Sequence, residues 1–255
     1  MQKPINNDYF RSIFTTKQVY YLSDSFTRDP IYNALVKMKV LELFAGSRSF
    51  SKVAEQRGHK VFTSDYKDFE GIDYVCDILD FDISKVPFEP DVIWASPPCT
   101  YFSVASIGHH WNKDHTPKTN EAILGVEIVQ KTLDIINELN PSVYFIENPR
   151  GKLRKLDVVR NLQRATICYC KYGEDRMKPT DIWSNFINTA FSYGWQPRPM
   201  CFNGNPHCHH QYAPRGSKTG TQGIKGNYLR SIVPEELCRE IIESVEKCTT
   251  FELTH

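Results

Sequence analysis

The stretch KVLELFAG, residues 39–46, decides the fold of this chain. Its apolar residues form a run short enough to be a buried strand, and Ala45-Gly46-Ser47 ends that strand in a turn. Residues 49–58 then carry apolar side chains at helical spacing and stop at Gly58. Glycine lets a ligand approach the backbone, and the start of a helix offers free N–H groups. The stretch therefore predicts a strand, a turn and a helix of the kind that holds a ligand.

The same alternation of strands and helices continues along the chain. Short apolar runs predict strands at 59–65, 74–77, 91–95 and 143–146, and an amphipathic pattern predicts a helix at 121–139. Strands that alternate with helices indicate a parallel sheet with helices on both faces. We therefore predict a doubly wound, mostly parallel α/β fold. Ligands of such folds bind at the carboxyl ends of the strands.

Length and texture predict one main domain with appendages, because 255 residues bury a single sizeable core. We expect an N-terminal extension at 1–37 and the main domain at 38–190. Residues 191–226 are rich in Pro, Gly, His and Cys and predict a small irregular lobe. The segment 227–255 contains a helical pattern, which we expect to pack back on the main domain.

No apolar run approaches the length that spans a bilayer, and the N-terminal stretch MQKPINNDYFRS lacks the apolar core of a secretory signal. Eight cysteines without such a signal indicate reduced thiols, used in catalysis, metal binding or packing. We therefore expect a cytoplasmic protein with no membrane partner.

The charge of the chain is unevenly distributed, although its formal net value is only +1. From Arg150 to Arg230 there are 14 Lys and Arg against 4 Asp and Glu, which leaves 17 against 26 in the remainder. This split indicates an acidic body with a basic face that would suit a polyanion. A solvated basic loop region is the competing interpretation.

Two acids follow predicted strands. Asp65 lies about twenty residues after Gly46, where nucleotide-binding α/β folds hold a ribose diol, and Asp77 follows the next strand. Each acid alone would be read as a turn or cap residue. Together with the glycine turn they favour a cofactor site.

The sharpest feature is SPPCTYFS, residues 96–103, directly after a predicted buried strand. Two prolines fix the backbone and hold Cys99 in the cleft. A thiolate there can add to carbon 6 of a pyrimidine, which makes carbon 5 able to accept a methyl group. Glu147, at the end of the next strand, is placed to protonate or hydrogen-bond ring N3. A buried inert cysteine is the alternative, and the prolines and the partner acid argue against it.

Over residues 40–240 the chain resembles the DNA cytosine-5 methyltransferase family, especially its small phage and prophage members. The motifs that carry the resemblance are Phe44-Ala45-Gly46, Pro98-Cys99 with Phe102-Ser103, Glu147-Asn148, Tyr172-Gly173 with Arg176, Lys178 and Thr180, and Gly226-Asn227 with Val233-Pro234. The resemblance implies that the domain at 38–190 is a Rossmann-like catalytic domain dependent on S-adenosylmethionine. It also implies a monomer in the cytoplasm of a bacterial or phage-infected cell.

The family's site residues map onto this sequence motif by motif. The resemblance implies that S-adenosylmethionine is held by Phe44, Gly46, Ser47, Asp65, Asp77, Pro97 and Asn227. It implies a flipped cytosine in the pocket and contacts to DNA from Ser103, Asn148, Lys178 and Thr180.

Three departures from the family pattern are evident. Arg48 and Ser49 stand where the family has a second glycine pair, and Thr180 replaces the second arginine of the basic motif. Only about forty residues separate Asn185 from Gly226, where the family's target-recognition region is normally large. Sequence specificity is therefore expected to be short, relaxed or supplied by another component.

The predicted lobe suggests two further sites. Cys170, Cys201, Cys208 and one histidine, taken as His209, could close a tetrahedral zinc site, against the alternative of loop histidines and reduced core cysteines. Arg215 and Lys218 lie in a glycine-rich polar run suited to phosphate contacts, or to a solvated loop.

Three rival functions stay open at the level of sequence. A methyltransferase for exocyclic amines would have an aromatic residue in place of Cys99 and leave Glu147 unexplained. A tRNA cytosine-5 methyltransferase would use the same catalytic residues, so only the substrate separates it. A catalytically inactive S-adenosylmethionine-binding module would show the same transfer with Cys99→Ser as with the wild type, namely none.

Overall fold

A computed structural model describes residues 37–104, 106–189, 194–212 and 226–253. The described residues belong to one compact unit, Lys37–His255. The predicted extension therefore lies outside the described residues except for Lys37, as do Arg215 and Lys218.

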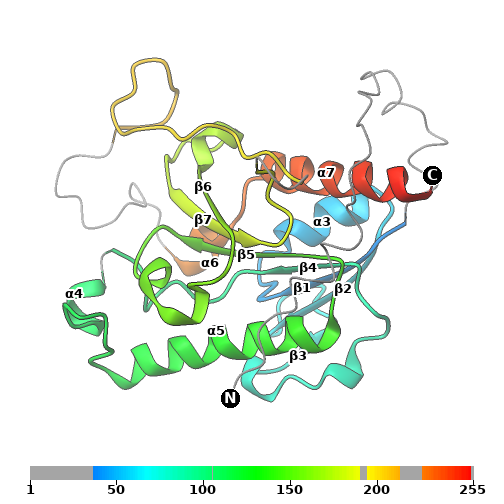
Figure 1. The fold of residues 1–255 in the computed structure, drawn as a ribbon, viewed down its shortest axis with the longest axis horizontal. Coiled ribbons are helices and arrows are strands. Elements are labelled where there is room, and N and C mark those ends of the chain that lie inside the picture. The colour runs from blue at the N-terminus through cyan, green and yellow to red at the C-terminus, as the bar shows by residue number, and fades with distance from the viewer. Residues whose placement is uncertain (1–36, 105, 190–193, 213–225, 254–255) are drawn as a thin grey trace. The chain divides into compact units, whose positions relative to one another are not determined.

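Seven strands among the described residues form one sheet in the order β3-β2-β1-β4-β5-β7-β6 (Figure 1). Strands β1 to β5 run parallel to one another, and β7 is antiparallel to both β5 and β6. The predicted doubly wound, mostly parallel α/β fold is confirmed. The strands are β1 (Lys39–Leu43), β2 (Lys60–Asp65), β3 (Tyr74–Val75), β4 (Val92–Ala95), β5 (Val143–Pro149), β6 (Arg164–Cys168) and β7 (Pro179–Ser184).

The central strands are apolar on both faces because helices cover both. Leu41 and Ile93 are buried in a core that includes side chains of α5 (Asn120–Leu139). Trp94, which points to the opposite face, stacks on Phe50 of α3 (Ser49–Gln56) with ring centroids 4.8 Å apart. Successive residues of a strand thus contribute to two cores, as the pleat requires.

The helices begin and end at recognisable signals. In α5 the Thr119 side chain accepts a hydrogen bond from the Ala122 amide at the start, and Asn140 adopts a left-handed conformation at the end. The last helix, α7 (Glu235–Leu253), packs on α3 as predicted for the C-terminal segment, and Arg57 binds its Glu246 at 2.6 Å. The short helices are α4 (Ile107–His110) and α6 (Asn227–Ser231).

The strand order indicates where a ligand could bind. It reverses between β1 and β4, so the loops that follow these strands diverge, and folds of this kind bind their ligands at the carboxyl ends of the strands at this point.

None of the helices in the described part of the chain is long and apolar enough for a membrane crossing.

Candidate active site

The loop that carries Cys99 is fastened to the strand that carries Glu147. Ala95, the last residue of β4, pairs with Ile146 of β5, and β5 continues beyond it to Pro149 as a partner of β7. Two residues beyond Ile146, the Asn148 side-chain amide donates a hydrogen bond of 2.9 Å to the Pro97 carbonyl. Asn148 is fully buried. It therefore holds the Cys99 loop in place, and its contact with nucleic acid stays a prediction.

Cys99 begins a compact turn. Its carbonyl accepts hydrogen bonds of 3.0 Å from the amides of Phe102 and Ser103. Phe102 is buried and its ring stacks on Trp111 at a centroid distance of 6.0 Å. A Cβ at Gly151 would lie 2.2 Å from the Phe102 carbonyl oxygen, so only glycine allows this approach. Cys99 is thus presented by a rigid backbone, as the two prolines predicted.

Two cations act on the Cys99 thiol. Burial raises the pKa of Cys99, and the positive charges of Lys178 and Arg230 oppose that rise. The negative charge of Glu147 acts in the direction of burial. The site therefore holds a thiol that Lys178 biases toward the nucleophilic thiolate.

The Glu147 carboxylate is held by a tyrosine that the sequence analysis did not single out. The Tyr169 hydroxyl donates a hydrogen bond of 2.8 Å to Glu147 Oε1, and Lys178 Nζ lies 3.8 Å from the same oxygen. Lys178 Nζ also lies 4.3 Å from the centre of the Tyr169 ring. Burial, followed by the charge of Glu147, raises the pKa of Tyr169 well above its ordinary value, so the hydroxyl stays a donor.

Tyr169 contacts the side chain of Thr180, which stands where the family has its second arginine. Thr180 is fully buried and its hydroxyl donates to the Lys178 carbonyl at 3.1 Å. Its contact with nucleic acid stays a prediction. Tyr169 lies in the 3-10 turn η6 (Tyr169–Tyr172) that follows β6. Strand β6 was not predicted, so no sequence signal placed this hydroxyl near Glu147.

The cofactor half of the edge is built around Gly46 and Asp65. A Cβ at Gly46 would lie 2.9 Å from the Phe69 ring and 3.2 Å from Asp65 Oδ2. Asp65 accepts a hydrogen bond of 3.0 Å from the Lys67 amide. Burial raises the pKa of Asp65, and the amides of Lys67 and Gly46 oppose it. The glycine turn and the acid at the end of β2 are therefore brought together, as predicted.

Two residues of this half adopt left-handed backbone conformations without being glycine. Phe44 has φ 61° and Arg48 has φ 51°. Such conformations cost of order 1–2 kcal/mol in a residue with a Cβ, and strained residues cluster at functional sites. Arg48 stands where the family has a glycine, and its backbone keeps the conformation that glycine prefers. Its side chain forms an ion pair with Glu55.

The C-terminal closing segment lies against the same turn. The Val233 amide donates to Ser49 Oγ at 3.1 Å, and Ser47 Oγ is 2.8 Å from Ser49 Oγ. The Tyr228 ring lies 5.9 Å from the Phe69 ring. Asn227 is the first residue of α6, and its side chain lies outside the described residues. The segment expected to lie beside the cofactor is therefore in contact with the cofactor turn.

Asp77 is an exposed cap residue. Its carboxylate accepts a hydrogen bond of 3.0 Å from the Leu79 amide and starts the 3-10 turn η2 (Ile78–Asp80). The alternative of a cap is therefore realised, and its carboxylate keeps lone pairs for a ligand.

The donor set at this edge fits S-adenosylmethionine. Carboxylates at Asp65 and Asp77 suit hydroxyl and amine donors. The amides of Phe50 and Ser51 at the start of α3 already donate to the buried Glu42 carboxylate, at 3.4 and 2.7 Å.

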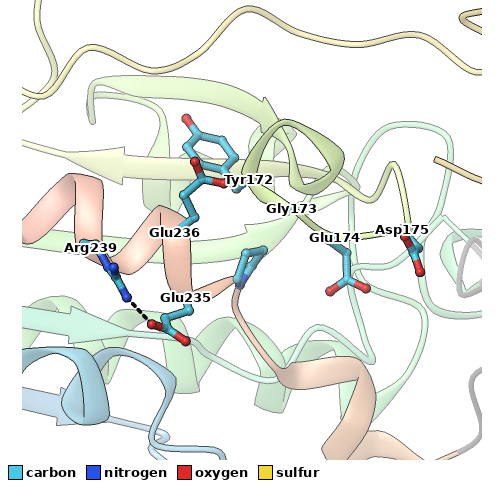
Figure 2. A pocket seen from close by; sticks show the side chains of 8 residues that line it. Tyr172, Gly173, Glu174, Asp175, Glu235, Glu236 and Arg239 are labelled. Carbon is cyan, nitrogen blue, oxygen red and sulfur yellow. Dashed lines mark hydrogen bonds and ion pairs between the residues drawn. The ribbon is translucent and has the colours of Figure 1, made fainter. Parts of the chain in front are cut away.

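A second hollow lies elsewhere, between η6 and the start of α7. It has a volume of about 670 Å³ and four acidic side chains in its wall, with Glu235 and Arg239 paired across one side (Figure 2). The acids are Glu174, Asp175, Glu235 and Glu236. Their negative charge disfavours a polyanion there. None of the residues that line the hollow belongs to the loop that carries Cys99.

The remaining predicted site residues are Ser103 and the proposed zinc ligands. Ser103 is half-buried and its Oγ lies 3.0 Å from Ser106 Oγ, on the turn that begins at Cys99. Cys170, Cys201 and Cys208 come together, but the histidine beside them is His210. The choice of His209 was wrong, because its exposed ring contacts the Glu174 carbonyl at 3.1 Å.

A family model for C-5 cytosine-specific DNA methylase matches residues 38–166, which is half of the chain. The chain belongs to the C-5 cytosine-specific DNA methylase family. Members of this family are enzymes that methylate carbon 5 of cytosine in DNA, and the matched residues contain both Cys99 and Glu147.

A relative in Frog virus 3 (isolate Goorha) has the name probable DNA (cytosine-5)-methyltransferase. It is 32% identical over 156 residues, which cover 58% of this chain and 71% of the relative. Two solved structures are also similar. A prophage-encoded protein of E. coli, named for DNA modification methyltransferase activity, has a TM-score of 0.43 at 16% identity over 58% of this chain. The Entamoeba histolytica methyltransferase EhMeth has a TM-score of 0.46 at 13% identity over 64% of this chain. The chain spans 46% and 58% of these two solved chains.

Proposed function

We propose that this chain methylates carbon 5 of cytosine in DNA, with Cys99 as the nucleophile and Glu147 as its acid partner. The observation that carries the proposal is that the loop of Cys99 is held against the strand of Glu147. The hydrogen bond from Asn148 to Pro97 joins the two segments, and the charge of Lys178 interacts with both side chains. A nucleophile and an acid at adjacent strand ends form a catalytic pairing rather than a packing arrangement.

The chemistry follows from the roles of these groups. Cys99 adds as thiolate to carbon 6 of the flipped cytosine, and Glu147 in its acid form donates its proton to ring N3, where electron density rises as carbon 6 is attacked. Carbon 5 becomes nucleophilic and accepts the methyl group, whose bond to the donor sulfur breaks. A base removes the proton from carbon 5, the bond between Cys99 Sγ and carbon 6 breaks, which frees the thiolate, and N3 returns its proton to Glu147.

S-adenosylmethionine, when bound, supplies an electrophilic methyl group. We propose that the turn residues Phe44, Gly46 and Ser47 and the acids Asp65 and Asp77 hold it, with Pro97 and Asn227 on the flanks. The support is the contact between Gly46 and Asp65 and the packing of the closing segment on the same turn.

We propose that Ser103 and Lys178 face the target nucleotide and that Arg215 and Lys218 contact phosphates. The excess of basic residues between 150 and 230 supports a polyanionic partner. A single chain forms both halves of the edge, which supports a monomer. The eight cysteines all lie in the described part of the chain and none forms a disulfide there, which supports a reducing compartment such as the cytoplasm. A zinc ion in the cysteine and histidine cluster completes the proposed set of bound groups.

The direct test is transfer of labelled methyl from S-adenosylmethionine to unmodified genomic DNA and to tRNA, followed by nucleoside analysis. Cys99→Ser is the test variant. Cys76→Ser is the matched control, because Cys76 lies at the same sheet edge after β3, and its thiol contacts Ser64 Oγ, at 3.5 Å, and the Tyr74 side chain.

We expect 5-methylcytosine in DNA with the wild type and Cys76→Ser and none with Cys99→Ser. DNA that contains 5-fluorocytosine should trap the wild type as a covalent complex, because fluorine cannot leave carbon 5 as a proton does. Label in tRNA alone would mean that the substrate is RNA and not DNA. Label on an exocyclic amine, or a trapped complex with Cys99→Ser, would overturn the mechanism.

A further inference from the structure

Three cysteines and a histidine converge at one end of the lobe. Cys170 lies in η6, and Cys201, Cys208 and His210 belong to the segment 201–210. The sulfur atoms and one ring nitrogen all lie within 4.8 Å of one another. Cys170, Cys201 and His210 are buried. Residues thirty positions apart in the sequence thus place soft ligand atoms around one point.

The spacing of these atoms suits one tetrahedral metal ion. Zinc binds sulfur at about 2.3 Å and imidazole nitrogen at about 2.0 Å, so ligand atoms around it are roughly 3.5–3.8 Å apart. Cys201 Sγ lies 3.7 Å from His210 Nδ1, which is already such a distance. A set of three thiols and one imidazole is a known structural zinc set. One ion at the centre would therefore need only small side-chain adjustments.

The backbone around the cluster is shaped for it. The segment folds back at Asn205, whose carbonyl accepts from the Cys208 amide at 3.2 Å and whose side-chain amide donates to Cys201 Sγ at 3.4 Å. Amide donors to sulfur stabilise a thiolate more than a thiol. His210 faces the cluster through Nδ1, so this nitrogen is the ligand atom and the buried Nε2 stays outside the set.

We propose that Cys170, Cys201, Cys208 and His210 form a closed structural zinc site. On binding, three thiols release their protons to solvent, and zinc gains three bonds to sulfur and one to nitrogen. The site joins the lobe to η6, the turn that carries Tyr169 against Glu147. The zinc site deepens the proposed function by supporting this turn, although metal binding itself does not require methyl transfer.

Two neighbouring residues serve as matched controls. Cys168 is fully buried beside the cluster, but its thiol accepts from the Cys201 amide at 3.4 Å and stands outside the ligand group. His209 adjoins His210 in sequence and turns away to the Glu174 carbonyl. Replacing either control changes the same chemistry at the same place without removing a ligand.

The experiment is metal analysis of the purified full-length protein, without DNA or cofactor. We expect one zinc per chain in the wild type, in Cys168→Ser and in His209→Ala. Cys201→Ser and His210→Ala should retain little zinc. If these ligand variants do not fold, cobalt substitution of the wild type gives the same information, because tetrahedral thiolate-bound cobalt absorbs in the visible range and zinc displaces it.

Three results would overturn the site. These are a wild type free of zinc whose cluster thiols all react with a thiol reagent, a disulfide between two cluster cysteines, or iron in place of zinc. Because the readout is metal content, a loss of methyl transfer with full zinc would count against the proposed function and leave the zinc site standing.

Discussion

The two halves of the sheet edge are built by different means. The catalytic half, between β4 and β5, is fixed by side-chain hydrogen bonds from Asn148 and Tyr169. The cofactor half, between β1 and β2, depends on close backbone approach at Gly46 and on left-handed residues at Phe44 and Arg48. Single side chains therefore carry the geometry of the first half, and backbone conformation carries that of the second. Substitutions should lower kcat in the catalytic half and change stability or cofactor affinity in the cofactor half.

The strongest test of this contrast is Glu147→Gln. Glutamine keeps the shape and can still accept from Tyr169 but cannot transfer a proton to N3. We expect kcat to fall by about 100-fold or more, with binding of S-adenosylmethionine unchanged. Single-turnover methylation and calorimetric titration measure the two quantities. A weaker cofactor affinity with unchanged kcat would break the assignment of Glu147 to the catalytic half.

Asn148→Ala removes the hydrogen bond that joins the Cys99 loop to strand β5. We expect a loss of about 10- to 30-fold in kcat, because misplacement of a catalytic group is costly, together with about 1–3 kcal/mol of stability. Asn185→Ala is the matched control. The Asn185 side chain accepts from the Tyr144 amide at 3.0 Å near the start of the same strand, and its amide donates to the Ser142 carbonyl at 3.0 Å. The control should lose similar stability and keep kcat; equal kcat in both variants would remove the special role of Asn148.

Tyr169→Phe tests the hydroxyl that supports Glu147. We expect kcat to fall about 10-fold and KM for DNA to change little, because the hydroxyl touches the acid and not the backbone of the nucleic acid. Tyr172→Phe is the control, since Tyr172 is buried in the same turn and its hydroxyl accepts from the Arg198 amide at 3.0 Å. Steady-state kinetics of both variants decide the matter. Equal losses would assign the effect to the turn as a whole.

Lys178→Gln tests the electrostatic support of Cys99. Burial raises the pKa of Cys99 and Lys178 counteracts it, so the variant should have a still higher thiol pKa and less thiolate at neutral pH. We expect the rate at neutral pH to fall roughly three- to tenfold, and the loss to shrink as pH rises. The pH dependence of Cys99 alkylation measures it, with Lys171→Gln, a half-buried lysine of η6, as the control. An unchanged pH profile would contradict the assignment.

The catalytic residues at the sheet edge could be predicted because they belong to short sequence motifs. Cys99 lies in the loop after β4 and Glu147 near the end of β5, and strand ends of a parallel sheet meet at one edge. Tyr169 could not be predicted, since β6 was missed and its partner lies 22 residues away. Choosing His209 failed for a similar reason, because spacing does not tell which of two adjacent histidines faces inward in an irregular loop. The burial of Asn148 and Thr180 could not be predicted either, because exposure cannot be read from a motif, and their contacts with DNA stay predictions.

The smallest effect is expected in the cofactor half, at Arg48, and a pair of variants isolates it. Arg48→Ala and Arg48→Gly both remove the ion pair with Glu55, so they differ only in how their backbones tolerate φ 51°. Glycine adopts this conformation without steric cost, whereas alanine keeps a cost of about 1–2 kcal/mol. Part of this advantage is offset, because glycine loses about 0.5–1 kcal/mol more entropy on folding. Arg48→Gly should therefore be more stable than Arg48→Ala by up to about 1 kcal/mol in urea unfolding, with kcat equal in both. Equal stabilities would mean that the turn relaxes, and that close approach at Gly46 alone shapes the cofactor half.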